Sequence, residues 1–129
     1  MRRMVASVTV LALAVAGGCT DRIDPTMGLQ ELESMERKFT GAVKVAEVTP
    51  RATLVAHVQH LQLIQQELGR VATSDCLKDA KQSLDRHMGL TIEALLSFIK
   101  NDNAERDRHL QESRGELEAY RRNVQKCGQ

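Results

Sequence analysis

Aromatic residues are scarce in this sequence, which contains no Trp, one Tyr and two Phe among its 129 residues. Sandwiches and barrels of β-strands usually build their cores from aromatic and β-branched residues, so an all-β fold is not expected. Proline and glycine are also few, with two and eight copies. This scarcity excludes collagen-like and low-complexity chains, which are rich in those two residues.

Neither sign of charge is in excess, since 18 Lys and Arg oppose 17 Asp and Glu and the formal net charge is +1. A nucleic-acid-binding surface requires a clear excess of basic residues, so no nucleic-acid partner is expected. Hydrophobic residues make up 42% and charged residues 27%, the ordinary balance of a globular protein. The length suits a single domain with one core.

The chain also lacks an apolar run long enough to form a membrane-spanning helix. The uncharged, mostly apolar run from Met4 to Ala16 has thirteen residues, whereas such a helix needs about 20. Arg2 and Arg3 precede it and supply the positive start of a secretory signal peptide. The run is therefore predicted to be the core of a signal peptide.

The residues that follow this run are Val15-Ala16-Gly17-Gly18-Cys19. Small residues directly before a cysteine, at the end of a short apolar run, resemble the lipobox of bacterial lipoprotein precursors. The resemblance implies that residues 1–18 are a lipoprotein signal peptide and that Cys19 is lipidated, with residues 19–24 as the lipidated cysteine and a short linker. The alternative is ordinary secretory cleavage after Ala16, which would release a protein without an anchor.

The predicted lipid groups fix the expected location of the protein. The resemblance implies three acyl chains on Cys19, more than the two signals that a stable membrane anchor requires. Thr20 follows Cys19, where an Asp would favour retention in the inner membrane. The chain is therefore expected to be anchored in the bacterial cell envelope, facing the periplasm, with the outer membrane favoured over the inner.

Four stretches of the remaining chain carry apolar residues at helical spacing, and each begins at a recognisable cap. Asp24-Pro25 is predicted to open the first helix, and Thr49-Pro50 to end it and to open the second. Ser74-Asp75 is predicted to cap the third helix, Asn101-Asp102-Asn103 to end it, and Asp102 with Glu105 to cap the fourth. The connections between these helices are short, which favours antiparallel neighbours.

Residues 25–127 are therefore predicted to form an all-α, antiparallel up-down bundle of four helices, or of three if the first helix is detached. The residues expected to face the core are Leu29, Leu32, Phe39, Val43 and Ala46 in the first helix, Leu54, Val58, Leu61, Ile64, Leu68 and Val71 in the second, Leu77, Ala80, Leu84, Met88, Ile92, Leu95 and Ile99 in the third, and Leu110, Leu117, Tyr120, Val124 and Cys127 in the fourth.

Cys76 and Cys127 are the two cysteines that remain after Cys19. They are equally distant from the turn at Asn101-Asp102-Asn103, so an antiparallel hairpin folded at that turn brings them level. A disulfide between them is therefore predicted to join the open end of the hairpin of helices 3 and 4, as expected in a compartment that oxidises thiols. The alternative, a redox-active or metal-binding thiol pair, has no C-x-x-C motif and no cluster with zinc-ligand spacing to support it.

Three histidines form the other candidate site. His57 and His60 lie one turn apart in the second predicted helix, and His87 lies at the level of His60 in the third. Three converging imidazoles can bind zinc or copper, and Met88 adds a soft donor nearby. The alternative, which we favour, is that each is an ordinary, partly buried surface imidazole, so no metal and no cofactor is expected.

Sequence motifs for catalysis are absent. The chain has no Glu-x-x-His for a di-iron centre, no C-x-x-C-H for covalent haem, and no nucleophile elbow, phosphate-binding loop or dinucleotide fingerprint. The sequence therefore predicts a protein that is not an enzyme: a lipid-anchored envelope accessory or interaction module with an unidentified envelope protein as its partner. The alternative is a small metal- or ligand-binding bundle in the periplasm that uses His57, His60 and His87.

Overall fold

The computed structural model describes residues 24–128, and these residues form helices without a strand. The four helices are α1 (Leu29–Glu47), α2 (Leu54–Gly69), α3 (Lys78–Ile99) and α4 (Asn103–Cys127). Two single turns of 3₁₀-helix, η1 (Arg51–Thr53) and η2 (Asp75–Leu77), precede α2 and α3. The prediction of an all-α fold with four helices is confirmed.

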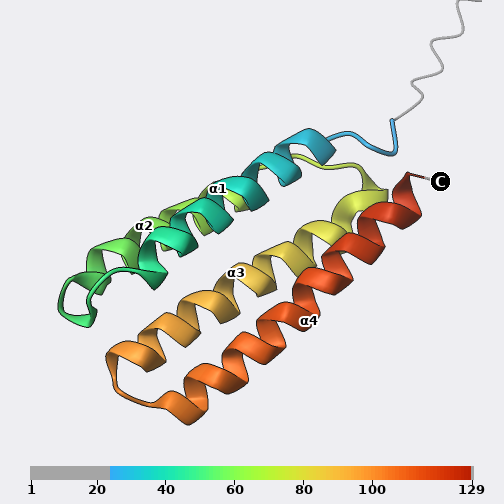
Figure 1. Cartoon of the computed structure of the whole chain (residues 1–129). Helices are drawn as coiled ribbons and strands as arrows, with labels where there is room; N and C mark the ends of the chain where they lie inside the picture. The colour runs from blue at the N-terminus through green and yellow to red at the C-terminus, as the bar shows by residue number, and fades with distance from the viewer. Residues whose placement is uncertain (1–23, 129) are drawn as a thin grey trace, which may run out of the picture.

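The helices run alternately up and down and are arranged as two pairs (Figure 1). Helix α1 packs on α2, α2 packs on α3, and α3 makes an extended contact with α4, whereas α1 and α4 make little backbone contact. The start of α1 and the end of α4 lie at the same end of the bundle. The predicted antiparallel up-down bundle is therefore observed, with the first helix attached and the seam between first and last helices less tightly closed.

The core is filled mainly by the apolar stripes of the first three helices, to which α4 adds Tyr120 and Cys127. The buried members of the predicted stripes are Leu32, Phe39, Ala46, Leu54, Val58, Leu61, Ile64, Leu68, Leu77, Ala80, Leu84, Met88, Ile92, Tyr120 and Cys127. In contrast, Val43 of α1 and Leu110, Leu117 and Val124 of α4 are only partly buried. These stripe positions stay accessible because α1 and α4 do not pack together along their length.

The start of α1 differs from the prediction. Residues 25–28 form a turn, which Asp24 stabilises by accepting a hydrogen bond from the Thr26 N–H at 2.8 Å. The helix begins at Leu29, after Gly28 with φ = 90°, and not at Pro25 as the cap-and-proline pattern predicts. The proline signature is correct for a turn, but the left-handed conformation of Gly28 interrupts the helix.

Ser74 also departs from its predicted capping role. Its hydroxyl donates to the Pro25 carbonyl at 2.5 Å, and its N–H donates to the Met27 carbonyl at 3.0 Å, so no side-chain cap of α3 forms. The segment before α1 is thereby fastened to the segment before α3. These two bonds link the N-terminal turn to the same end of the bundle as the disulfide.

The hairpin of α3 and α4 agrees with the sequence at both ends. Asp102 accepts a hydrogen bond from the Glu105 N–H at 3.1 Å and caps α4 as predicted. Cys76 in η2 and Cys127 at the end of α4 form the predicted disulfide, with their Cα atoms 5.7 Å apart.

Between residues 24 and 128, the helices are too short or too polar to qualify as membrane spans.

Candidate functional site

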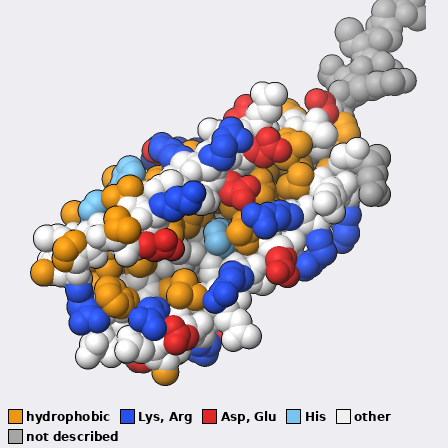
Figure 2. Space-filling model, viewed as in Figure 1, with side chains coloured by type: hydrophobic (Ala, Val, Ile, Leu, Met, Phe, Trp, Pro, Cys, Tyr) orange, Lys and Arg blue, Asp and Glu red, His pale blue; other side chains and the backbone are white. Residues whose placement is uncertain are grey.

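An elongated cleft runs along the seam between α1 and α4, and we call it the α1–α4 cleft. It consists of three depressions with volumes of about 570, 390 and 260 Å³, which follow one another along α4 from Arg121 to Arg106 and share lining residues. Figure 2 shows the hollow between the two helix pairs, with Lys and Arg side chains along its edges. The cleft therefore follows the seam at which α1 and α4 make little contact.

The cleft has an apolar lining drawn from all four helices. Its apolar members are Phe39, Val43 and Ala46 of α1, Leu54 of α2, Ala94, Leu95 and Phe98 of α3, and Leu110 and Leu117 of α4. Several of these are the partly buried stripe residues that the sequence predicts to face inward. Phe39, Ala46, Leu54 and Ala94 form the buried floor of the cleft, and the partly exposed apolar surface comes from the other five residues.

Basic residues predominate over acidic ones along the cleft. The charged lining residues are Arg37, Lys44, Arg106, Arg114 and Arg121 against Glu33, Glu36 and Glu47. Arg121 lies 3.6 Å from Glu36, and Arg106 pairs with Asp107. Neither Lys44 nor Arg114, both at the central depression, forms an ion pair with another described residue.

His87 lies in the wall of the central depression and is held by a small hydrogen-bond network. Its Nδ1 is 2.9 Å from the Ser113 carbonyl oxygen and 2.8 Å from Ser113 Oγ. Since a carbonyl oxygen only accepts, Nδ1 carries the proton. Thr91 Oγ1 donates to the His87 carbonyl at 2.9 Å and lies 2.7 Å from Ser113 Oγ, so Ser113 can donate to Thr91 and both hydroxyls and Nδ1 have partners.

The surroundings of His87 favour its neutral form. Burial lowers the pKa of the imidazole, and the charge of Arg121 adds to this, while the hydrogen bond to Ser113 and the charge of Glu36 oppose it. The ring also packs edge-on against Phe39, with the centroids 5.9 Å apart. A neutral ring protonated on Nδ1 leaves Nε2 as a hydrogen-bond acceptor.

The candidate cluster of His57, His60 and His87, the alternative that the sequence left open, does not come together among the described residues. His87 points toward Phe39 of α1 and Ser113 of α4, while His60 is exposed on α2 and His57 is half-buried there. Across residues 24–128, no three His, Cys, Asp or Glu side chains come close enough together to hold a metal ion. Equal height along two helices does not fix the direction of a side chain around the helix axis, and this is why His60 and His87 lie level but point apart.

The sequence analysis missed Ser113 and Thr91, the two partners of His87. A signal for Ser113 exists, because the predicted core stripe of α4 has no member among the six residues between Leu110 and Leu117. Ser113 occupies the vacant inward position and is 2% exposed. A polar residue at a core position of a helix requires a buried partner, and His87 and Thr91 supply it.

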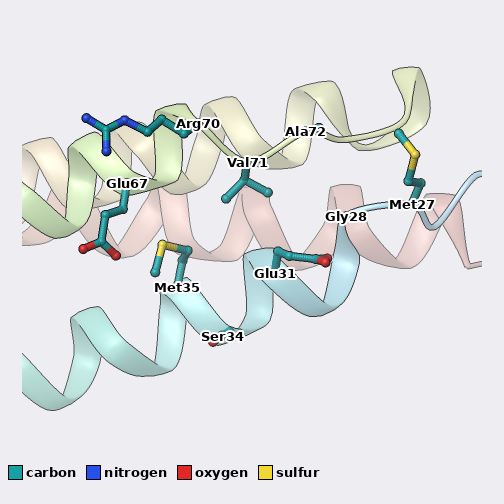
Figure 3. Close-up of a pocket in the computed structure, with 9 residues that line it drawn as sticks. All are labelled: Met27, Gly28, Glu31, Ser34, Met35, Glu67, Arg70, Val71 and Ala72. Carbon is teal, nitrogen blue, oxygen red and sulfur yellow. The ribbon is translucent and has the colours of Figure 1, made fainter.

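A second pocket, of about 610 Å³, lies between the first turns of α1 and the end of α2. Met35 and Val71 point into the gap between the helices, whereas Arg70 points away from it (Figure 3). Glu67, which also lines the pocket, pairs with Lys38 at 2.6 Å. The polar groups of this pocket do not converge on a common point, so we take the α1–α4 cleft as the candidate site.

The predicted signal peptide, 1–18, and the predicted lipidation site, Cys19, lie outside the described residues. Cys76 and Cys127 are joined and supply no free thiol.

No protein-family model, no curated protein and no solved structure matches the chain. The candidate site is therefore argued from its own geometry.

Proposed function

We propose that the chain is a lipid-anchored module of the bacterial cell envelope that faces the periplasm and acts without catalysis, by binding a partner protein in the α1–α4 cleft. The observation that carries this proposal is the accessibility of predicted core residues, Val43, Leu110 and Leu117, along one seam of an otherwise packed bundle. Apolar surface of this kind, bordered by charged residues, is typical of protein interaction sites.

The arrangement of the chain ends is compatible with anchoring at Cys19. Only Thr20 to Ile23 separate Cys19 from Asp24, and the five extended steps between these two residues span at most about 18 Å. The end of the bundle with the disulfide would therefore lie close to the lipid headgroups, and the cleft would extend away from the membrane. A disulfide that closes a long loop is also typical of an oxidising compartment such as the periplasm.

The chemistry of the His87 network favours binding over catalysis. Ser113 and His87 are within hydrogen-bond distance, as in a nucleophile and base pair, but Nδ1 already carries a proton and cannot take the one on Ser113. Ser113 is also 2% exposed, so its hydroxyl is not accessible to a substrate. The network thus stabilises the packing of α3 against α4.

Site-specific photocrosslinking in intact cells tests the proposed function. A photoreactive residue at Thr40, exposed at the edge of the cleft, is compared with one at Gln62, exposed on α2 outside the cleft. We expect an adduct with one envelope protein from position 40 and none from position 62. The adduct should disappear in Leu117→Asp, which places a charge in the cleft, and circular dichroism checks that this variant remains folded. Absence of an adduct at position 40, or equal adducts at both positions, would contradict the proposal.

A further inference from the structure

The proposed function leaves open what kind of segment occupies the α1–α4 cleft. We propose that it is an acidic amphipathic α-helix of the partner, with apolar residues in the three depressions and carboxylates against the basic residues at the edges. This inference rests on the proposed function and adds the chemistry of the ligand to it.

The shape of the cleft favours a helix. The three depressions lie in a row along α4, at Leu117–Arg121, at Leu110–Leu117 and at Arg106–Leu110. Successive apolar residues on one face of a helix, spaced by one or two turns of about 5.4 Å each, can enter depressions arranged in this way.

The exposure of the cleft argues against a lipid chain as its occupant. The hollow is open on its outer side (Figure 2), so an acyl chain lying in it would keep one side in water. An amphipathic helix carries its own polar face and covers the apolar lining without that cost. A protein segment thus suits the open seam better than a hydrocarbon.

The charges of the cleft favour acidic residues on that helix. Lys44 on α1 and Arg114 on α4 border the central depression from its two sides and have no ion-pair partner among the described residues. Glu47 is the acidic residue that lines the same depression. Carboxylates flanking an apolar stripe would lie beside both cations, as charged residues flank the seam of a coiled coil.

The polar wall of the central depression does not oppose an apolar guest. His87, Thr91 and Ser113 satisfy one another, and burial keeps the pKa of His87 below its ordinary value. An apolar side chain seated beside them leaves these hydrogen bonds intact, and Nε2 of His87 is the one acceptor of the network that a donor on the guest or a water molecule has to meet. The charged groups that need partners in the complex therefore lie at the edges of the cleft, where the exposed cations would meet the carboxylates of the helix.

Peptide binding to the mature, anchored protein tests the inference. The protein is placed in phosphatidylcholine nanodiscs, and empty nanodiscs serve as the blank. One labelled peptide of about 20 residues carries Leu at helical anchor positions with Glu beside them, and its matched partner has Lys in place of every Glu. At a salt concentration of about 50 mM, we expect the Glu peptide to bind at least about tenfold more tightly than the Lys peptide.

Charge reversal in the protein separates the cleft from the rest of the surface. The double variant Lys44→Glu/Arg114→Glu should invert the preference between the two peptides. Lys78→Glu/Arg122→Glu makes the same change in net charge at exposed positions outside the cleft and should leave the preference unchanged. Circular dichroism of each variant checks that the bundle remains folded.

Equal affinity for the two peptides, or a preference that the cleft double variant does not change, would overturn the inference. A crosslink from position 40 to an envelope protein would still support the proposed function in that case, so the two failures are distinguishable. An adduct at twice the mass of the chain would identify a second copy as the occupant, and an adduct with phospholipid would identify a lipid. Either of these adducts would also overturn the acidic helix.

Discussion

Gly28 holds a backbone conformation that other residues adopt only with strain. Its φ is 90°, and a Cβ atom there would overlap the Ala72 carbonyl oxygen and crowd Thr73. Gly28→Ala is therefore expected to lower the free energy of unfolding by about 2 kcal/mol, from the left-handed conformation and the overlap together. Chemical denaturation of the purified variant measures this loss.

Gly41 provides the matched control for that substitution. It lies in the middle of α1, and a Cβ atom at its position would meet nothing within 4 Å. Gly41→Ala should raise the free energy of unfolding by about 1 kcal/mol through helix propensity alone. If both variants shift stability in the same direction, the account of Gly28 is wrong.

His87 gives the stability of the protein a defined pH dependence. Burial holds the pKa of the folded-state imidazole below its ordinary value of 6.5, so the unfolded chain binds a proton first as the pH falls. The free energy of unfolding should therefore decrease on acidification below about pH 6.5, by at most about 1.4 kcal/mol per pH unit for this one group. Above about pH 6.5 the imidazole is neutral in both the folded and the unfolded chain, so His87 no longer makes the free energy of unfolding depend on pH.

The variant His87→Gln isolates this contribution, because its side chain does not titrate. We expect its unfolding free energy to fall less between pH 7 and pH 5 than that of the wild type. Other titrating groups contribute to both curves, so the difference between the two slopes is the quantity to compare. Parallel curves would show that His87 titrates alike in the folded and unfolded chains.

At the scale of helices, the disulfide is the strongest single constraint on the α3–α4 hairpin. Cys76 and Cys127 are 51 residues apart in sequence, and chain-entropy arguments give about 4 kcal/mol for closing a loop of that length. Replacing both cysteines by serine should therefore lower the melting temperature by more than 10 °C for a domain of this size.

Reduction provides a control for the double cysteine variant. A reductant should lower the melting temperature of the wild type to near that of Cys76→Ser/Cys127→Ser and leave the variant unchanged. A wild-type melting curve that is insensitive to complete reduction would contradict the structural role of the bond.

The sequence determines the helices well where the local signals agree. Asp102 caps α4, and the equal spacing of Cys76 and Cys127 from the turn correctly predicts their disulfide. The predicted start of α1 is wrong because the signal of Pro25 belongs to a turn and Gly28 delays the helix. Local patterns predict that a helix exists better than they predict its first residue.

The candidate site was less accessible to sequence reasoning than the helices. A stripe of apolar residues predicts which face of α4 turns inward, but not whether α1 closes against it. Leu110 and Leu117 follow the stripe and nevertheless line a cleft. The orientation of His87 toward Ser113 likewise depends on how α3 is rotated, which its height along the bundle does not determine.

At the scale of the whole molecule, the proposed anchor would fix the orientation of the cleft relative to the membrane. The two ends of the described chain and the disulfide lie at one end of the bundle, where Cys19 would attach it to a membrane, and the cleft runs along the bundle from there (Figure 1). Anchoring by a short linker would restrict the module to partners near the membrane surface and raise their effective concentration there. The proposal that this is an envelope interaction module depends on that anchor.

The most direct test of this account is therefore the intact mass of the protein purified from membranes without reductant or chelator. We predict a chain that begins at Cys19, carries the mass of its acyl groups, lacks the two hydrogens lost in the Cys76–Cys127 bond and contains no metal. A soluble chain that begins at Gly17 without acyl mass would contradict the anchored module.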